Sequence, residues 1–134
     1  MIKATELQIG DFVLVDGTPR KVEAITKKKI GYHRKEKEPR LYYARLHDVE
    51  PIEINEYVLR ISGFCVSETE KTVFARFDND KLKVEIVLFK NASEDPQVII
   101  TNKDTHSCYV GGTRYVHEFQ HLFRPCGVNF EVKL

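Results

Sequence analysis

The sequence predicts an α+β fold, mostly antiparallel β, arranged as a single domain over residues 1–134. Three observations carry this prediction. Short runs rich in β-branched and aromatic residues recur along the chain, with turn residues between them. Only two segments combine a helical cap with a helical spacing of apolar residues. Strands and helices do not alternate regularly, as they would in a parallel sheet. We expect residues 1–52 to form an SH3-like small barrel, and residues 53–134 to form an antiparallel sheet on which one helix packs.

The composition is that of an ordinary globular protein. Hydrophobic residues make up 42% of the 134 residues and charged residues 31%, which argues against disorder and against a coiled coil. No apolar run approaches the roughly 18 residues that span a membrane, and the first six residues lack the apolar core of a signal peptide. Cys65, Cys108 and Cys126 form an odd, widely spaced set that is typical of free thiols in a reducing compartment. We therefore expect a cytoplasmic protein without membrane association, and the sequence leaves its oligomeric state open.

The first predicted hairpin joins a strand at Phe12–Val15 to a strand at residues 21–25. Asp16-Gly17 lies between them and favours a tight turn, because Gly tolerates a positive φ. Thr18-Pro19 follows and indicates a slightly longer connection. Residues 27–40 are too charged for a core, so they predict a long exposed loop or an extended hairpin tip.

A further strand is predicted over residues 41–47, because a run of aromatic and apolar residues resumes there. Successive side chains of a strand point to opposite faces. This alternation gives two sets of three residues: Tyr42, Ala44 and Leu46 on one face, and Tyr43, Arg45 and His47 on the other.

The first predicted helix lies near residues 55–62. Asn55 is suited to the N-cap position, since its side-chain oxygen can accept a bond from an unpaired backbone N–H. Ile54, just before the cap, can pack on Leu59 as a hydrophobic staple. Gly63 can adopt the left-handed conformation that ends a helix.

The predicted C-terminal sheet contains strands at residues 72–77 and 82–89, joined by a turn at residues 78–81. Val98–Ile100 forms the next strand, and residues 107–110 can add a short one. The alternation of apolar and polar residues along these runs indicates a sheet with one buried face.

The second predicted helix lies near residues 113–123, with Thr113 as its cap after a chain break at Gly111-Gly112. Arg124-Pro125 ends it, and residues 128–134 can return as an edge strand. At 100° per residue, five residues form one apolar stripe: Tyr115, Val116, Phe119, Leu122 and Phe123.

The predicted core collects the inward residues of these strands and helices. Its members are Phe12, Leu14, Val22, Leu46, Ile54, Val58, Leu59, Val84, Ile86, Val98, Ile100, Val116, Phe119 and Phe123.

Charge is unevenly distributed along the chain. Residues 20–46 contain ten Lys or Arg against three Glu, a net charge of +7, and the rest of the chain has a net charge of −6. Basic side chains neutralise phosphates and tyrosine stacks on bases, so this segment predicts a surface for nucleic acid or for an acidic protein. The alternative is a solvated loop without a binding role, in which the negative charges of Glu36 and Glu38 interrupt the positive potential. The candidate binding residues are Lys27, Lys28, Lys29, Arg34, Lys35, Arg40, Tyr43 and Arg45.

Residues 117–121 fit the H-E-x-x-H pattern of zinc hydrolases, in which His117 and His121 would hold zinc and Glu118 would act as general base. A catalytic zinc needs a third protein ligand, for which Cys108 is the nearest upstream thiol. The apolar stripe of this helix points away from both histidines, so we expect the two side chains to face solvent. The favoured interpretation is therefore a protein that is not an enzyme and has neither metal nor cofactor; an HExxH-type zinc hydrolase and a protein–protein adaptor are the alternatives.

Three stretches resemble a family of short proteins, of uncharacterised function, from gut-bacterial prophages and mobile elements. They are residues 7–17, 51–64 and 115–122, the last of which reads YVHEFQHL. In that family the last stretch usually reads Tyr-Val-His-Glu-Leu-Gln-Asn-Leu. The resemblance implies that Asn usually stands in the place of His121, which argues against zinc, and it implies an accessory protein of a phage or mobile element. The tail after Phe123 departs from the family.

Overall fold

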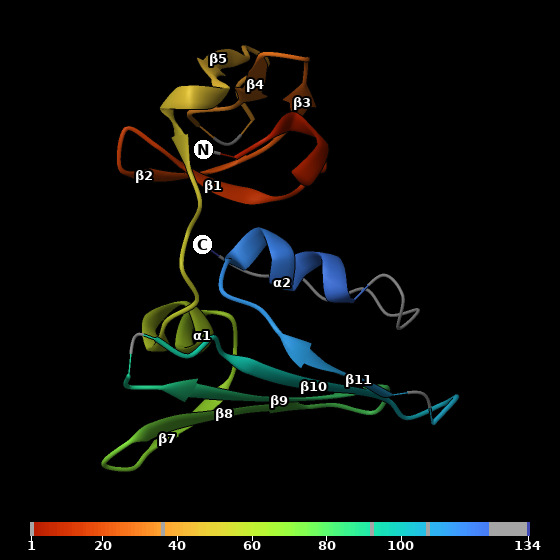
Figure 1. Ribbon diagram of the computed structural model, residues 1–134. Coiled ribbons are helices and arrows are strands. Elements are labelled where there is room, and N and C mark those ends of the chain that lie inside the picture. Colours follow the sequence, from red (N-terminus) through yellow and green to blue (C-terminus); the bar gives the residue numbers. More distant parts are fainter. Residues whose placement is uncertain (1, 36, 92, 107, 124–133) are drawn as a thin grey trace. The chain divides into compact units, whose positions relative to one another are not determined.

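The computed structural model describes residues 2–35, 37–91, 93–106, 108–123 and 134. The chain forms two compact units, unit 1 at Met1–Ile52 and unit 2 at Glu53–Leu134. Figure 1 shows antiparallel strands in both units and two short α-helices in unit 2. The predicted mostly antiparallel α+β class is confirmed.

Unit 1 contains two three-stranded antiparallel sheets, with strand orders β2-β1-β6 and β3-β4-β5. A short 3-10 helix, η1, precedes β1 and another, η2, precedes β6. The element bounds in unit 1 are η1 Ala4–Glu6, β1 Phe12–Val15, β2 Thr18–Lys21, β3 Ala24–Ile25, β4 Lys29–Tyr32, β5 Tyr42–Arg45, η2 Leu46–Asp48 and β6 Val49–Glu50.

The hairpin between β1 and β2 is tighter than Thr18-Pro19 indicated. Val15 pairs with Thr18, so Asp16 and Gly17 alone form the turn. Their φ angles are 51° and 75°, which is the geometry of a type I′ turn. Pro19 lies within β2, where it is tolerated because β2 is an edge strand of its sheet.

The predicted strand at residues 21–25 is divided between the two sheets. Between β2 and β3, the Val22 N–H donates to the Asp11 carbonyl over 2.8 Å, and the Glu23 N–H donates to the Gly31 carbonyl over 2.8 Å. The backbone therefore leaves one sheet and joins the other within two residues. Val22 is fully buried at this bend.

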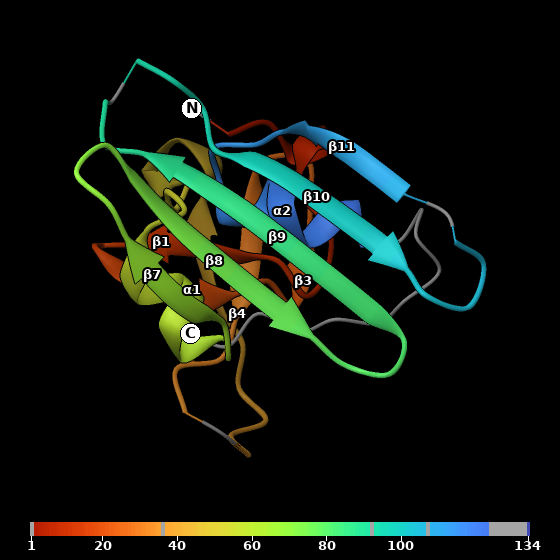
Figure 2. The same ribbon diagram turned by 90° about the horizontal axis from the view of Figure 1, so that it is seen from below.

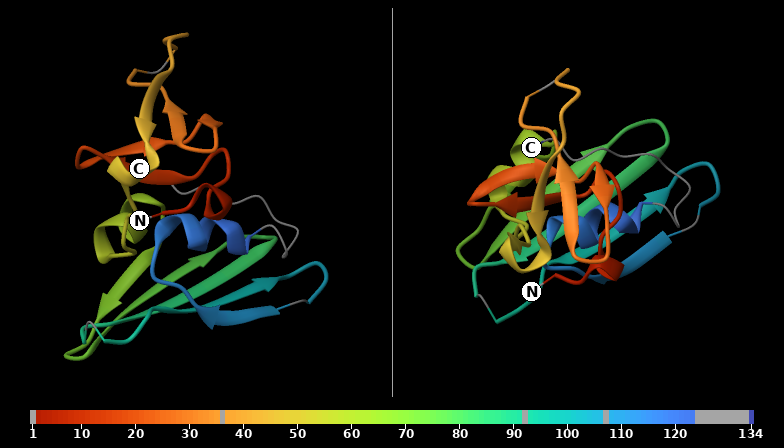
Figure 3. Two further views of the ribbon diagram at one scale, coloured as in Figure 1. Left: turned by 45° about the horizontal axis from the view of Figure 1, so that its top comes forward. Right: turned by 90° about the horizontal axis from the view of Figure 1, so that it is seen from above.

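Residues 27–40 contain a strand that the sequence analysis missed. β4 starts at Lys29, and its next three residues, Ile30, Gly31 and Tyr32, are buried. Lys27 and Lys28 lie in the turn that leads into β4, and residues 33–41 join β4 to β5. The described residues of this second connection extend away from both sheets of unit 1 (Figure 3). The charge of the flanking residues masked a short apolar strand.

The core of unit 1 uses the opposite face of β1 from the one predicted. Val13 and Val15 are buried, whereas Phe12 and Leu14 are half-buried. All four residues are apolar, so the sequence could not specify which face points inward. Leu46 is half-buried and packs against this core, whose buried members are Ile2, Leu7, Val13, Val15, Val22, Ile30, Tyr32 and Val49.

Unit 2 contains a five-stranded antiparallel sheet with strand order β11-β10-β9-β8-β7 (Figure 2). Both helices lie on the same side of it, whereas one was expected (Figure 1). β7 was not predicted, and Gly111-Gly112 continue β11 instead of breaking the chain. The bounds are α1 Glu56–Ile61, β7 Cys65–Glu68, β8 Thr72–Asp78, β9 Leu82–Phe89, β10 Gln97–Asn102, β11 Cys108–Gly112 and α2 Val116–Leu122.

The caps of α1 are as predicted. The Asn55 side chain accepts a hydrogen bond from the Val58 N–H over 2.9 Å, and Gly63 follows the helix with a φ of 95°. The α2 helix instead begins three residues later than predicted, at Val116. Thr113 is not its cap, because the N-cap residue is Tyr115; the Thr113 N–H donates to the Pro96 carbonyl over 3.0 Å.

Aromatic rings link α2 to the sheet of unit 2. Phe119 lies 6.3 Å from Phe64, which in turn lies 5.7 Å from Phe77 of β8, measured between ring centroids. The predicted core residues of unit 2 are all buried: Ile54, Val58, Leu59, Val84, Ile86, Val98, Ile100, Val116, Phe119 and Phe123. The predicted helix end at Arg124-Pro125, and the predicted strand at residues 128–134 except for Leu134, lie outside the described residues.

Candidate nucleic-acid interface

A tight turn carries two lysines at the start of β4. The Thr26 N–H donates to the Lys29 carbonyl over 2.8 Å, and the Lys29 N–H donates to the Thr26 hydroxyl over 3.0 Å. Lys27 and Lys28 lie at the tip, and the Leu46 N–H donates to the Lys28 carbonyl over 2.9 Å. These backbone bonds fix the turn against η2.

Two rows of side chains cross the exposed face of the sheet formed by β3, β4 and β5. Lys29 pairs with Arg45 in one row, and Gly31 pairs with Tyr43 in the next. Lys29, Arg45 and Tyr43 are all exposed. Directly opposed like charges destabilise a strand pair, so the Lys29–Arg45 row is not explained by the stability of the sheet.

The Tyr43 ring lies across Gly31. A Cβ atom placed on Gly31 would lie 3.1 Å from Tyr43 Cε1 and 3.0 Å from the Cβ of Ala24. Gly31 is buried under the ring, while Tyr43 itself is 55% exposed. The Cδ1 and Cε1 atoms of the ring thus lie close to the backbone of β4, and much of the ring surface is open to solvent.

A surface hollow of about 460 Å³ lies beside this ring, at the end of β5. It is lined by Lys27, Lys28, Lys29, Arg45, Leu46 and His47. His47 lies in η2 and not on the predicted strand, since β5 ends at Arg45. We refer to Lys27, Lys28, Lys29, Tyr43, Arg45 and His47 as the basic platform.

The cations of the basic platform have few anionic partners. Within the described part of the chain, the ion pairs include none of Lys27, Lys28, Lys29 and Arg45. His47 of the platform does lie near a carboxylate, because Asp48 Oδ1 is 3.4 Å from His47 Nε2. The local positive charge is therefore available to an external anion.

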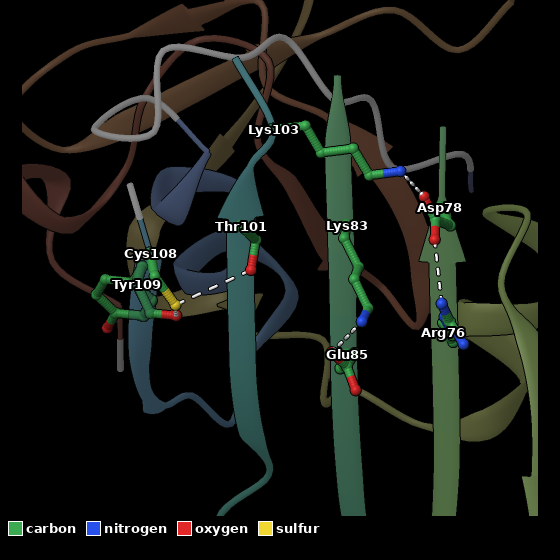
Figure 4. Close-up of polar contacts among 8 residues, drawn as sticks. All are labelled: Arg76, Asp78, Lys83, Glu85, Thr101, Lys103, Cys108 and Tyr109. Carbon is green, nitrogen blue, oxygen red and sulfur yellow. Dashed lines mark hydrogen bonds and ion pairs between the residues drawn. The ribbon is translucent and has the colours of Figure 1, made fainter. Parts of the chain in front are cut away.

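Cations of unit 2 are used differently (Figure 4). Lys83 pairs with Glu85 over 3.2 Å, and Asp78 pairs with both Arg76 and Lys103. The hydrogen bond from Lys103 holds the pKa of Asp78 below its usual value of 3.8, against an opposing desolvation, and Arg76 adds to the lowering. These charges stabilise one another and offer little to a partner.

Three of the eight predicted binding residues lie away from the hollow. The guanidinium carbons of Arg34 and Arg40 lie 4.1 Å and 4.8 Å from the centroid of the Tyr42 ring, so both cations pack on a ring of the opposite face of β5. Lys35 is exposed in the loop between β4 and β5. The structure brings together the other five, Lys27, Lys28, Lys29, Tyr43 and Arg45.

One feature of the basic platform was missed in the sequence. Gly31 supports Tyr43 only because Lys29–Tyr32 is a strand, and the surrounding charge concealed that strand. The cross-strand register pairs Gly31 with Tyr43, and no local pattern encodes it. His47 was expected on one face with Tyr43 and Arg45, and in the structure it lines the hollow from η2.

His117 of the HExxH segment is buried, contrary to the prediction that both histidines face solvent, while His121 is half-buried. The His117 ring stacks on Tyr115 at 5.9 Å and contacts the His121 ring edge-on at 6.1 Å. The buried side of α2 is wider than its apolar stripe. For this reason the projection at 100° per residue wrongly placed the His117 side chain in solvent.

Glu118 caps α2. One carboxylate oxygen, Oε1, accepts hydrogen bonds from the N–H groups of Tyr115 and Arg114 over 3.1 Å and 3.4 Å. A carboxylate in the first helical turn is also stabilised by the helix dipole. Its position is thus explained without a bound metal or water.

The described residues include no group of three His, Cys, Asp or Glu side chains that could hold a metal ion. Cys108, the candidate third ligand, is exposed on β11, with its Sγ 4.0 Å from the Thr101 hydroxyl (Figure 4). Cys65 is likewise an exposed free thiol, as predicted. Cys126 lies outside the described residues.

Comparisons with protein-family models, with curated proteins and with solved structures gave no match. Of the helices that the structure describes, none has both the length and the apolar character needed to cross a membrane.

Proposed function

We propose that this protein is a small, non-catalytic binding module that engages a polyanion, nucleic acid above all, through the basic platform. The observation that carries the proposal is the convergence of four cations on one surface hollow of unit 1, with the open ring of Tyr43 in the neighbouring row of the sheet. Phosphate contacts supply most of the affinity of such a surface.

The energetics of the platform support this role. Opposed Lys29 and Arg45 repel each other in the absence of a partner. A bound phosphate would lie between two positive charges and turn this repulsion into attraction, with charge-assisted hydrogen bonds. An acidic protein would satisfy the same charges, but it would not use the open ring of Tyr43.

The scaffold is consistent with an SH3-like small barrel. The backbone from Thr18 to Ile25 bends from one sheet into the other, and η2 leads into β6, which pairs with β1. Small β-barrels present binding surfaces on their strands and connecting loops. We further propose a cytoplasmic accessory protein of a phage or mobile element, in line with the three stretches that resemble such proteins.

A salt titration tests the proposed function. Fluorescence anisotropy of labelled DNA, both duplex and single-stranded, is measured at several salt concentrations. If about four phosphates are contacted, log affinity should fall against log salt with a slope of roughly −3 to −4. Absence of binding at low salt to either form of DNA would contradict the proposal and favour a protein–protein adaptor.

A further inference from the structure

We propose that the partner is single-stranded nucleic acid, in which one unstacked base lies on Tyr43 while Lys29 and Arg45 hold the neighbouring phosphate. This inference rests on the proposed function and specifies its substrate class. It commits to a single strand over a duplex, because the platform combines a stacking surface with a phosphate clamp.

Tyr43 has the geometry of a stacking platform. Its ring lies against Gly31 through Cδ1 and Cε1, and the residue is 55% exposed, so much of the ring surface is open to a ligand. Stacking on aromatic rings is a main source of affinity for unpaired bases, and it tolerates any base because each has a π face.

The other tyrosines of the segment do not offer a comparable surface. Tyr32 is buried, and its ring lies 6.2 Å from that of Tyr42. The Tyr42 ring is covered by Arg34 at 4.1 Å and by Arg40 at 4.8 Å. Tyr43 is the ring in this group that remains open.

The spacing of the two rows fits one nucleotide. Tyr43 and Arg45 lie two residues apart on the same face of β5, a separation of about 7 Å. The Lys29–Arg45 row therefore lies next to the Gly31–Tyr43 row, within reach of the phosphate attached to a base stacked on Tyr43. Further phosphates of the strand would reach Lys27, Lys28 and His47 in the hollow.

A duplex cannot use this arrangement fully. Its base faces are stacked inside the helix, and only base edges are accessible in the grooves. An exposed tyrosine ring can stack on a base face only when the base is unpaired. Duplex DNA would thus gain the phosphate contacts alone.

The test compares Tyr43→Leu and Tyr43→Phe with the unmodified protein, and anisotropy is measured with labelled oligothymidine, an abasic strand of equal length and a hairpin duplex. Leu removes the π face, whereas Phe retains it. We expect Tyr43→Leu to weaken oligothymidine binding about 5- to 150-fold. Tyr43→Phe should retain most of the affinity, and neither change should alter binding of the abasic strand or the duplex.

Tyr57→Leu is the matched control, because Tyr57 is a 69% exposed tyrosine of α1 in unit 2. It should leave binding of every probe unchanged. Circular dichroism of all three variants checks that the fold is retained.

The outcomes separate this inference from the proposed function. If Tyr43→Leu leaves oligothymidine binding unchanged, or weakens the duplex and the single strand equally, the base-stacking inference is wrong while a phosphate-binding function stands. Polyglutamate bound more tightly than oligothymidine would overturn it in favour of an acidic protein. If no DNA probe binds at low salt, the proposed function itself fails.

Discussion

At the residue scale, Gly31 determines how Tyr43 is presented. We expect Gly31→Ala to weaken binding of single-stranded DNA, because the added Cβ would lie 3.1 Å from the ring and push it off the sheet. The fold should tolerate the change, since the exposed ring can swing outward and Ala lowers the entropy of the unfolded chain. Anisotropy should show the loss, while urea unfolding should show a stability change within about 1 kcal/mol. A large loss of stability would mean that Ala24, at 3.0 Å, cannot move aside.

Glu118 gives a second prediction at this scale. As the capping carboxylate of α2, it satisfies backbone N–H groups that have no partner within the helix. Glu118→Ala should therefore lower the free energy of unfolding by about 1 kcal/mol, and Glu118→Gln should cost less because the amide oxygen still accepts. Urea denaturation measures both. Equal stability of all three proteins would refute the capping role.

The two histidines give a third prediction, which addresses the zinc hydrolase alternative. Protein purified without a histidine tag should contain far less than one zinc per chain, because no third donor accompanies His117 and His121 among the described residues. Elemental analysis decides this. One zinc per chain that is lost in His121→Ala, with the fold retained, would establish a metal site.

At the element scale, the sequence predicted most strands and both helices of unit 2. In unit 1 it did not predict the buried face of β1 or the existence of β4. Strict alternation along β9 predicted its buried face correctly. Every residue of Phe12–Val15 is apolar, so the local pattern could not show which face of β1 is buried. Tertiary packing determines that face. β4 was missed because two lysines precede it and a third, Lys29, begins it, and the basic platform includes residues of that strand.

Ion pairs between neighbouring elements give a prediction about pH. The pKa of Asp78 is lowered mainly by its hydrogen bond to Lys103, which follows β10, and also by Arg76. A lowered folded-state pKa means that the charged form stabilises the fold above the unfolded-state value of 3.8. This contribution is lost as the pH falls through the folded-state pKa.

The free energy of unfolding of Asp78→Asn should accordingly fall less steeply than that of the unmodified protein as the pH is lowered below about 4. Urea unfolding between pH 6 and pH 2 measures the effect. Asp80→Asn is the control, because Asp80 lies in the same turn and belongs to no ion pair among the described residues. An unchanged acid profile for Asp78→Asn would indicate that solvent screens the pair completely.

At the scale of the whole molecule, the net charge is only +1, although positive charge is concentrated in residues 20–46. The cations of unit 2 are largely paired, as Lys83 with Glu85 and Lys90 with Glu68. Those of the basic platform are not paired with described carboxylates. Affinity for an anion should therefore depend on position within the chain and not on the sum of charges.

Two charge-matched double variants test this dependence. Lys27/Lys28→Ala and Lys71/Lys81→Ala each lower the net charge by the same amount, and all four lysines are exposed. The first should reduce the slope of log affinity against log salt by about 1.4 to 1.8, because two phosphate contacts are lost. The second should leave both affinity and slope unchanged, since Lys71 and Lys81 lie in the turns that precede β8 and β9. Equal weakening by both variants would mean that net charge alone drives binding, and that the hollow beside Tyr43 is not a site.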